Sequence, residues 1–445
     1  MNILYLAHRI PYPPDKGDKL RAFRHIEHLA RRHRVWCACF VDAPADRVHV
    51  APLAAYCQDV AAIQLGRVRA GIRGALGLTG GGTITEAFYR RRPMRTIVQR
   101  WVASIPFESV VAFSSSMAQY ALRIPAARRV LDMCDRDSLK WRDYAARTTK
   151  PIRRLYRIEA DRLADREHAL LDAFDATILV TDAEAEGLRF ARCADRLHVV
   201  GNGVALPDID RPPVRSATGP VVGFVGAMDY RPNVDAVCWF VAKCWPAVRS
   251  AYPTARFRIV GRSPTRVVRR LAGRPPSPGA GGIEVTGHVD DVTTEVLGLD
   301  VSVAPLRIAR GVQNKVLEAM AAARPVVLTR GAATGIGAQA GRDYIIADTA
   351  AETASGVIGL LAAPERAREV GASARRFVAD RHRWDRELER FEAVVTGHPV
   401  LAMADKPRWA ALPACARRSA PDALREPSTR ASLDCGVKPQ RGDLE

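Results

Sequence analysis

Short apolar runs alternate with amphipathic helical segments along this chain, and they do so in two successive series. In the first series the strand-like runs are residues 2–7, 35–41, 109–113, 129–132 and 176–180. In the second series they are residues 220–225, 258–260, 283–285, 301–304 and 326–328. Strands that alternate with helices form parallel sheets with helices on both faces. The pattern therefore predicts an α/β protein with two doubly wound, Rossmann-like domains.

A length of 445 residues also exceeds what one ordinary core accommodates, and a proline-rich connector at 206–213 precedes the second series. We expect a first domain over residues 1–190 and a second over 191–375. Residues 376–398 predict a closing helix that packs back on the first domain. Residues 399–445 lack any period and predict a disordered tail.

Composition narrows the class of protein. With 48% hydrophobic and 26% charged residues, the chain has the make-up of a globular protein, and no apolar stretch approaches the roughly 20 residues that span a bilayer. Its start lacks the basic and apolar regions of a secretory leader, so we expect a cytoplasmic protein. The nine cysteines include no Cys-x-x-Cys pair, which favours inert thiols.

The net charge is strongly positive. It is +19 overall, and residues 1–190 hold 31 Lys and Arg against 21 Asp and Glu. Such a surplus suits nucleotide phosphates, a lipid pyrophosphate, an anionic membrane or nucleic acid. The chain has no recognisable recognition helix, aromatic stacking signature or zinc spacing, so nucleic acid is not expected as a partner.

The most informative segment is 303–327. A strand ends, a loop carries Gly311, a helix begins near Gln313, and a Pro-Val-Val strand follows. Helix N-termini favour anions, so Lys315 in the first turn predicts a diphosphate site. Glu318 lies on the same helical face and is assigned to a ribose beyond the phosphates. The alternative is an exposed i,i+3 ion pair without a ligand.

This segment resembles the signature of retaining family 4 glycosyltransferases of GT-B fold, in which Lys-x-x-Glu-Ala-Met-Ala precedes a Pro-Val-Val strand. It looks closest to sugar transferases associated with exopolysaccharide and PEP-CTERM loci. Further matching pieces run over residues 222–233, 285–290 and 202–204. The resemblance covers roughly residues 1–395. It implies two domains that face each other across a cleft.

The resemblance also implies a function. The donor would be a nucleoside-diphosphate sugar acting as co-substrate, with no resident cofactor and no obligatory metal. The enzyme would be a hexosyltransferase that retains the anomeric configuration. Its acceptor would be a glycan or a polyprenyl-linked sugar in cell-surface polysaccharide synthesis.

Carried over by position, the resemblance also assigns residues. Gly226 would approach the donor phosphates, and the nucleotide base would lie at Gly287, His288 and Val289. The remaining donor-site residues would be Gly311, Gln313, Asn314, Lys315 and Glu318. Two departures stand out. Arg310 replaces a glutamate that usually contacts the sugar, and Arg231 is the candidate for a cation lost from the loop after residue 225.

The acceptor side is predicted at the strand ends of the first domain. The loop after the first strand offers Lys16, Gly17, Lys19 and Arg21 to an anionic acceptor, although a solvated loop and helix cap would have the same composition. Relatives often carry a histidine after a later strand, where this chain has only hydroxyl groups. The remaining candidates are Ser114, Ser116, Asp132 and, with a catalytic role, Asp135.

Asp135-Arg136-Asp137 imitates the Asp-x-Asp metal motif of another glycosyltransferase fold. We interpret it as a helix N-cap cluster, with no metal. Residues 64–101 interleave apolar side chains with arginines. They predict either a surface that rests on the inner face of an anionic membrane, or ordinary core helices with arginines outside.

Three other functions remain compatible with the sequence. A nucleotide-sugar epimerase would use the same donor site without an acceptor. A catalytically silent scaffold would have the fold and no activity, and a basic nucleic-acid-binding protein would use the charge alone.

Overall fold

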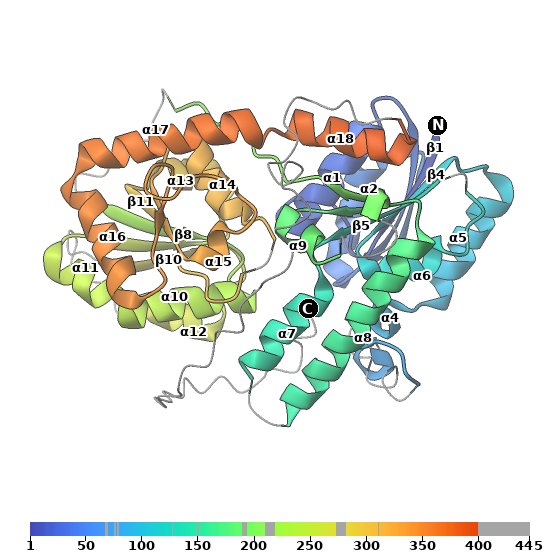
Figure 1. Cartoon of the computed structure of the whole chain (residues 1–445), viewed down its shortest axis with the longest axis horizontal. Helices are drawn as coiled ribbons and strands as arrows, with labels where there is room; N and C mark the ends of the chain where they lie inside the picture. The colour runs from blue at the N-terminus through green and yellow to red at the C-terminus, as the bar shows by residue number, and fades with distance from the viewer. Residues whose placement is uncertain are drawn as a thin grey trace, which may run out of the picture.

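The computed structural model describes residues 1–66, 70–74, 77, 80–126, 128–148, 151–188, 194–209, 219–272, 282–309 and 311–398. The predicted tail and Arg310 lie outside these residues. Figure 1 shows two domains side by side, each built around one parallel sheet. The prediction of an α/β protein with two doubly wound domains is confirmed.

The first sheet has the strand order β3-β2-β1-β4-β5-β6-β7, with every pair parallel. Its strands are β1(Asn2–Ala7), β2(Arg34–Val41), β3(Asp59–Gln64), β4(Ser109–Phe113), β5(Arg128–Cys134), β6(Ala176–Leu179) and β7(Leu197–Val199). The strand order reverses between β1 and β4, where sheets of this kind bind ligands. Because β7 belongs to this sheet, the first domain extends past the boundary expected at residue 190.

The second sheet repeats this arrangement as β10-β9-β8-β11-β12-β13. Its strands are β8(Val221–Val225), β9(Arg256–Val260), β10(Ile283–Gly287), β11(Val301–Ala304), β12(Val326–Leu328) and β13(Ile345–Ile346). Here the order reverses between β8 and β11. Three strands escaped the sequence prediction, namely β3, β7 and β13. β7 and β13 are too short to show a period, whereas β3 is only partly buried and its pattern is weak.

Helices cover both faces of the first sheet. Side chains of β1 alternate between the faces, with Leu4 and Leu6 on one and Ile3 and Tyr5 on the other. Leu4 and Leu6 pack under α4(Ile84–Tyr89), α5(Arg92–Ser104), α6(Ala118–Ala121) and α8(Ile152–Ala173). The opposite face packs against α1(Gly17–Leu29) and α18(Trp384–Thr396). The other α-helices described in this domain are α2(Val50–Ala54), α7(Asp137–Ala146) and α9(Asp182–Glu186).

The packing bears on the two interpretations of residues 64–101, of which the membrane surface stays a prediction. The aromatic side chains of Phe88, Tyr89 and Trp101 are buried in the core under α4 and α5. Ile72 is the exception and is 57% exposed. For the three aromatic residues the alternative is right, since they are core residues of helices with arginines outside.

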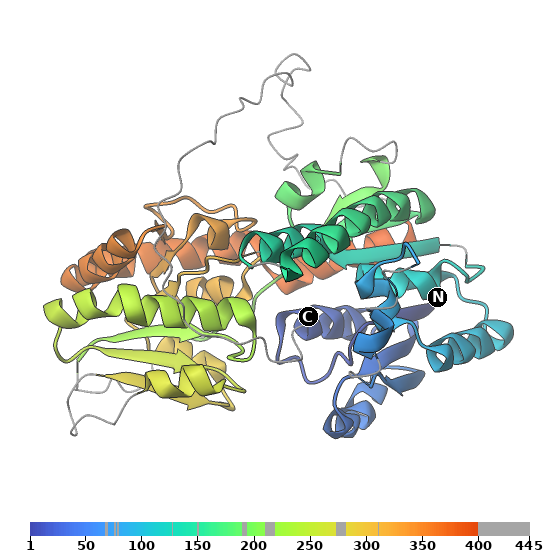
Figure 2. The same cartoon turned by 90° about the horizontal axis from the view of Figure 1, so that it is seen from below.

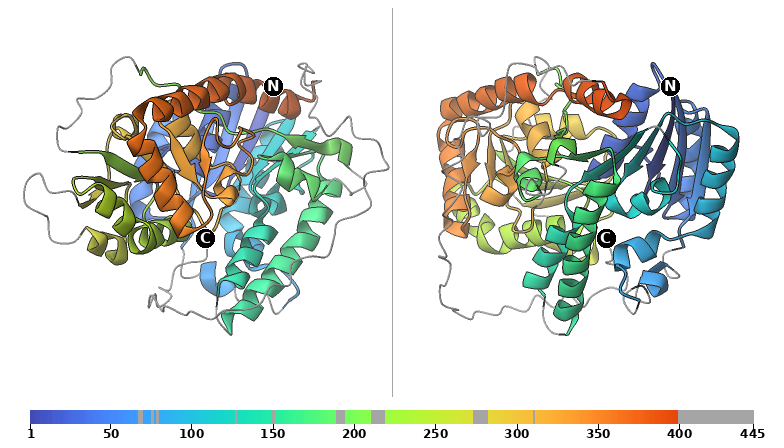
Figure 3. Two further views of the ribbon diagram at one scale, coloured as in Figure 1. Left: turned by 60° about the vertical axis from the view of Figure 1, so that its left-hand side comes forward. Right: turned by 45° about the vertical axis from the view of Figure 1, so that its right-hand side comes forward.

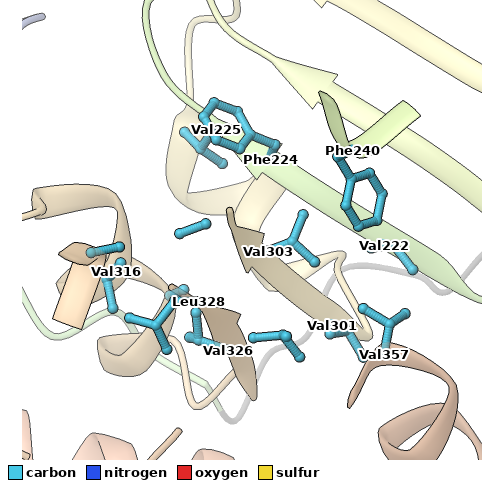
Figure 4. Close-up of a cluster of buried hydrophobic side chains, with 14 of the residues drawn as sticks. Val222, Phe224, Val225, Phe240, Val301, Val303, Val316, Val326, Leu328 and Val357 are labelled. Atoms are coloured by element: carbon cyan, nitrogen blue, oxygen red, sulfur yellow. The ribbon is translucent and has the colours of Figure 1, made fainter. Parts of the chain in front are cut away.

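The second domain has one core, shown in Figure 4. Val316 of α14(Asn314–Ala321) lies beside Leu328, and the valines of β8 and β11 fill the centre. This contact anchors the helix that carries Lys315. The other α-helices here are α10(Arg231–Lys243), α11(Trp245–Ala251), α12(Arg266–Leu271), α13(Val292–Leu297), α15(Arg330–Ala333), α16(Ala350–Ala362) and α17(Pro364–Arg381).

Two helices at the C-terminal end of the described chain join the domains. α17 packs on α14 in the second domain, and α18 packs on α1, β4 and β5 in the first. Figure 2 and Figure 3 show the pair running along both domains. None of the helices in the described residues is both long and apolar enough to span a membrane.

Candidate functional site

The carboxyl ends of the two sheets meet at the domain boundary. Loops that follow strands of the first sheet touch loops that follow strands of the second. A Cβ at Gly17 would lie 3.2 Å from Nδ2 of Asn314, and a Cβ at Gly335 would lie 2.3 Å from Cγ2 of Thr181. The predicted ligand-binding loops of both domains therefore face each other.

Lys315 is held in this boundary by the first turn of α10 and lies beside the loop after β8. Its Nζ donates to Oδ1 of Asn233 at 3.1 Å and lies 5.5 Å from the centroid of the Phe224 ring. A Cβ at Gly226 would lie 3.2 Å from Cε of Lys315 and 2.7 Å from Nδ2 of Asn233. Burial lowers the pKa of Lys315 to about 8. The ammonium group of Lys315 is thus fixed and partly desolvated. It lies close to the backbone of Gly226, where no side chain blocks the approach of a ligand.

Glu318 lies on the same helix. Burial raises the pKa of its carboxyl group, and the charge of Lys315 acts in the opposite direction. Lys315 donates a hydrogen bond to Asn233 instead. No ion pair within 4.0 Å joins Lys315 to Glu318. The alternative of an exposed i,i+3 ion pair therefore does not describe these residues. The predicted ribose contact of Glu318 stays a prediction.

Gly311 brings the donor-side loop against the first domain. Its φ of 60° lies in the left-handed region, which glycine adopts without strain. A Cβ there would lie 2.0 Å from Oδ1 of Asp135. Burial, with a smaller contribution from Asp137, raises the pKa of Asp135 to about 6. Asp135 thus lies at the boundary, next to the loop that leads into α14.

The two carboxylates of the Asp-x-Asp imitation have different neighbours. Asp137 accepts a hydrogen bond from Oγ of Ser115 at 2.8 Å, whereas Asp135 lies against Gly311. The N-cap of α7 is Arg136, which makes no side-chain capping bond. The cluster is therefore not the N-cap we expected, although Asp137 does lie in the first helical turn. Within the described part of the chain, no three His, Cys, Asp or Glu side chains are grouped as metal ligands.

Arg21 and Asp132 form a buried pair rather than an open acceptor surface. Arg21 is 1% exposed, and its Nε donates to Oδ2 of Asp132 at 2.9 Å. Its Nη1 donates to Oδ1 of Asn202 at 2.9 Å, and Nδ2 of Asn202 donates to Oδ1 of Asn314 at 2.9 Å. The prediction of direct acceptor contact does not fit these two residues, because they form an ion pair away from solvent. Together they support Asn314 at the start of α14.

The other acceptor-side candidates have mixed surroundings. Lys19 is buried and lies 3.6 Å from Asp15, whose other oxygen binds Nη1 of Arg262 at 2.6 Å across the boundary. Lys16 is the half-buried N-cap of α1. Oγ of Ser114 and Oγ of the fully buried Ser116 are 3.0 Å apart. Ser116 therefore does not face a ligand, whereas the half-buried Ser114 remains a candidate.

Arg231 contacts the first domain, and its role as a replacement cation stays a prediction. Its guanidinium lies 5.5 Å from the centroid of the Tyr144 ring, on α7 of the first domain. At the edge strand β10, Gly287 has a φ of 73°, and His288 is exposed and 3.8 Å from Asp290. The structure gives Gly287, His288 and Val289 a position at the carboxyl end of the second sheet, and no contact there tests their role.

Two residues were not predicted as site residues. Asn233 anchors Lys315 and donates through Nδ2 to the carbonyl of Ala227 at 2.9 Å. Arg262 follows β9, and its carbonyl accepts a hydrogen bond from the Met228 amide at 2.9 Å. Both follow strands of the second sheet. The rule that ligands bind at the carboxyl ends of strands would have found Arg262, whereas the pairing of Asn233 with Lys315 depends on packing.

Comparison with known proteins adds a family to this geometry. Residues 219–363 match the family described as glycosyl transferases group 1. Those residues contain β8, Gly226, Arg262, Gly311, Lys315 and Glu318. No curated protein matches the sequence significantly.

Several solved structures share the fold over most of the chain. Sucrose-phosphate synthase from Thermosynechococcus elongatus has a TM-score of 0.66 and 17% identity, over 88% of this chain and 98% of that one. HepE from Anabaena, in complex with UDP and glucose, has a TM-score of 0.61 and 15% identity, over 89% and 100%. An α,α-trehalose-phosphate synthase from Burkholderia vietnamiensis has a TM-score of 0.58 and 12% identity, over 89% and 100%.

At these identities the solved structures show the fold alone. It is the GT-B fold, which consists of two Rossmann-like domains. The family match covers residues 219–363, which lie in the second domain. The chain accordingly has the GT-B fold, and its second domain matches the glycosyl transferases group 1 family over residues 219–363.

Proposed function

We propose that this enzyme transfers a sugar from a nucleoside-diphosphate sugar to a glycan or polyprenyl-linked acceptor in cell-surface or exopolysaccharide synthesis. One observation carries the proposal. Lys315 is a partly desolvated cation that Asn233 holds beside Gly226, at the start of a helix anchored in the domain core. An oriented ammonium group beside side-chain-free backbone suits a diphosphate. The solved structure of HepE, which contains UDP and glucose, supports this class of donor.

The chemical step breaks the bond between the anomeric carbon and the diphosphate oxygen. Negative charge then develops on the diphosphate, and fixed cations stabilise it most in a desolvated site. In our proposal Lys315 neutralises this charge. We assign the role of a second stabilising cation to Arg262 and not to Arg231. The carbonyl of Arg262 accepts a hydrogen bond from the loop after β8. The step then proceeds without an obligatory metal.

On the acceptor side we propose Asp135. With a pKa raised to about 6 by burial, it is mostly ionised at neutral pH and accepts a hydrogen bond from the incoming hydroxyl group. The acceptor oxygen bonds to the anomeric carbon on the face that the diphosphate leaves, and its proton passes to the Asp135 carboxylate, so the anomeric configuration is retained. Membership of family 4 and an origin in a PEP-CTERM-associated system complete the proposal.

The test is donor binding by isothermal titration across nucleoside-diphosphate sugars, with and without a divalent metal. Lys315→Ala should weaken binding of the preferred donor by about tenfold to a hundredfold, because a charge-assisted hydrogen bond contributes roughly 1.5–3 kcal/mol. The matched control is Lys243→Ala, an exposed lysine in the last turn of α10. Equal affinity in the two variants would contradict the site assignment.

A second measurement distinguishes transfer from epimerisation. The purified enzyme is incubated with the preferred donor alone, and the sugar is analysed. A transferase does not change the stereocentres of the donor sugar in the absence of an acceptor. A new epimer formed without acceptor would replace the proposed function by the epimerase alternative.

A further inference from the structure

A basic cavity of about 340 Å³ lies on the first domain among α4, α5, α6 and α8. Its polar lining consists of Glu86, Arg90, Arg95, Gln119, Arg123 and Arg166. Four arginines and one glutamate meet there, so the cavity is strongly positive. An anion is the ligand that this balance favours.

The positive charge is only partly neutralised within the protein. Nε of Arg166 binds Oε1 of Glu86 at 2.7 Å, which uses the one carboxylate. Nε of Arg90 lies 3.5 Å from Oε1 of Gln119. Across the described residues, the guanidinium groups of Arg95 and Arg123 have neither a hydrogen bond nor an ion pair, and both residues are exposed. Two arginines at the cavity are thus available to a ligand, and the planar fork of a guanidinium group suits phosphate oxygens.

An apolar groove of about 170 Å³ continues from this cavity and shares Arg95, Gln119 and Arg123 with it. Its apolar lining includes Val98, Val102, Tyr120 and Ile124. A free phosphate or a nucleic acid would occupy the arginines and leave this groove empty. A phospholipid occupies both, with its phosphate at the arginines and its hydrocarbon in the groove.

The position of the cavity separates it from the donor site. In Figure 1 and Figure 2, α5 lies on the side of the first domain away from the second domain. Close by, Nη2 of Arg73 donates to the carbonyl of Phe88 on α4, and the adjacent Ile72 is 57% exposed. An exposed apolar side chain thus belongs to the chain neighbour of an arginine that contacts α4.

We propose that the cavity and groove bind the headgroup phosphate and the adjacent hydrocarbon of an anionic phospholipid in a membrane. The site attaches the enzyme to the surface where lipid-linked acceptors reside. It uses none of the donor-site residues, so lipid binding is tested independently of the proposed function, and only the location of the acceptors rests on that function.

The test is flotation of the full chain with vesicles of phosphatidylcholine, with or without phosphatidylglycerol. The wild type should bind only the anionic vesicles. Arg95→Gln with Arg123→Gln should weaken that binding by about 25-fold, at roughly fivefold for each arginine near an anionic surface. The matched control is Arg366→Gln with Arg368→Gln on exposed positions of α17, which removes the same charge and should bind like the wild type.

Two further arms identify the ligand. Val102→Ser should weaken vesicle binding without a change in charge, and inorganic phosphate should compete only weakly. The proposal is overturned if the wild type does not bind anionic vesicles, or if both double variants lose binding equally. It is also overturned if inorganic phosphate or duplex DNA binds as tightly as the vesicles, with the same dependence on Arg95 and Arg123. Thermal unfolding and donor affinity, which should be unchanged, show that each variant is folded.

Discussion

At the scale of single residues, Lys315 shows how position alters the chemistry of an ammonium group. Its spacing from Glu318 is visible in the sequence, but its bond to Asn233 and its desolvation arise only in the folded domain. In the proposed function the charged Lys315 binds the donor diphosphate, so its protonation state should control donor affinity.

Donor affinity should therefore decline as the pH rises through about 8, the lowered pKa of Lys315. Above that pH the free enzyme increasingly holds a neutral amine, and binding must include the uptake of a proton. Titration of the donor between pH 6.5 and 9.5 measures this decline. The residual binding of Lys315→Ala should lack it, and a decline of the same size in that variant would assign the titration to another group.

Asp132 gives the second residue-scale prediction. Asp132→Asn removes the charge opposite Arg21, which is 1% exposed. Loss of one partner of a buried ion pair costs about 3–5 kcal/mol of unfolding free energy. The control is Asp161→Asn, which breaks an exposed pair with Arg142 whose side chains are 71% and 53% exposed, and should cost less than about 1 kcal/mol. Chemical denaturation compares the two, and equal losses would argue against a structural role for the buried pair.

At the scale of elements, α14 depends on its contact with α17. Gly371 of α17 allows this contact, because a Cβ there would lie 2.1 Å from the carbonyl oxygen of Ala323, just after α14. The helices cannot keep this approach with a larger residue. The element that positions Lys315 is thus supported by a glycine more than fifty residues further along the chain.

Gly371→Ala should consequently lower the unfolding free energy by roughly 1–3 kcal/mol, the usual cost of overpacking. Gly359 of α16 is a matched control, since no atom lies within 4 Å of a Cβ built there. Gly359→Ala should raise stability by about 0.5–1 kcal/mol through helix propensity. Denaturant unfolding of both variants tests the difference. A neutral Gly371→Ala would mean that α17 shifts without cost.

At the scale of the whole molecule, α18 connects the end of the described chain to the first domain. Its Glu392 accepts hydrogen bonds from Nε2 of His28 at 2.7 Å and Nε2 of His33 at 3.0 Å, and it lies 3.2 Å from Nη1 of Arg32. Phe391 and Val394 are buried in the same core. Since α17 packs on the second domain, the α17–α18 pair ties the two domains together.

Glu392→Gln should destabilise the protein by about 1–3 kcal/mol at pH 7, because it removes hydrogen bonds to a charged group. Partial burial acts to raise the pKa of Glu392, but the bonds from His28 and His33 hold it below its usual value. Its stabilising effect is therefore complete above the unfolded pKa of about 4.3 and lost as the pH falls through the lower folded pKa.

The wild type and Glu392→Gln should accordingly converge in stability below about pH 4. The control is Glu389→Gln, an exposed position on the same helix, which should change little at any pH. Thermal unfolding as a function of pH measures both. If the stability difference between the wild type and Glu392→Gln persists at low pH, the shape of the Glu392 side chain and not its charge explains its contribution.

The sequence by itself determined most strands of the two series, the loop that carries Gly311 and the helix that carries Lys315 and Glu318. These features depend on local periodicity and on helix termini, which neighbouring residues specify. Only the tertiary structure decided which polar groups meet. It paired Arg21 with Asp132, moved Arg231 to Tyr144 and brought Arg262 to Asp15. Such contacts join residues far apart in the chain. Packing within and between the two domains sets their distances, and no local sequence pattern specifies them.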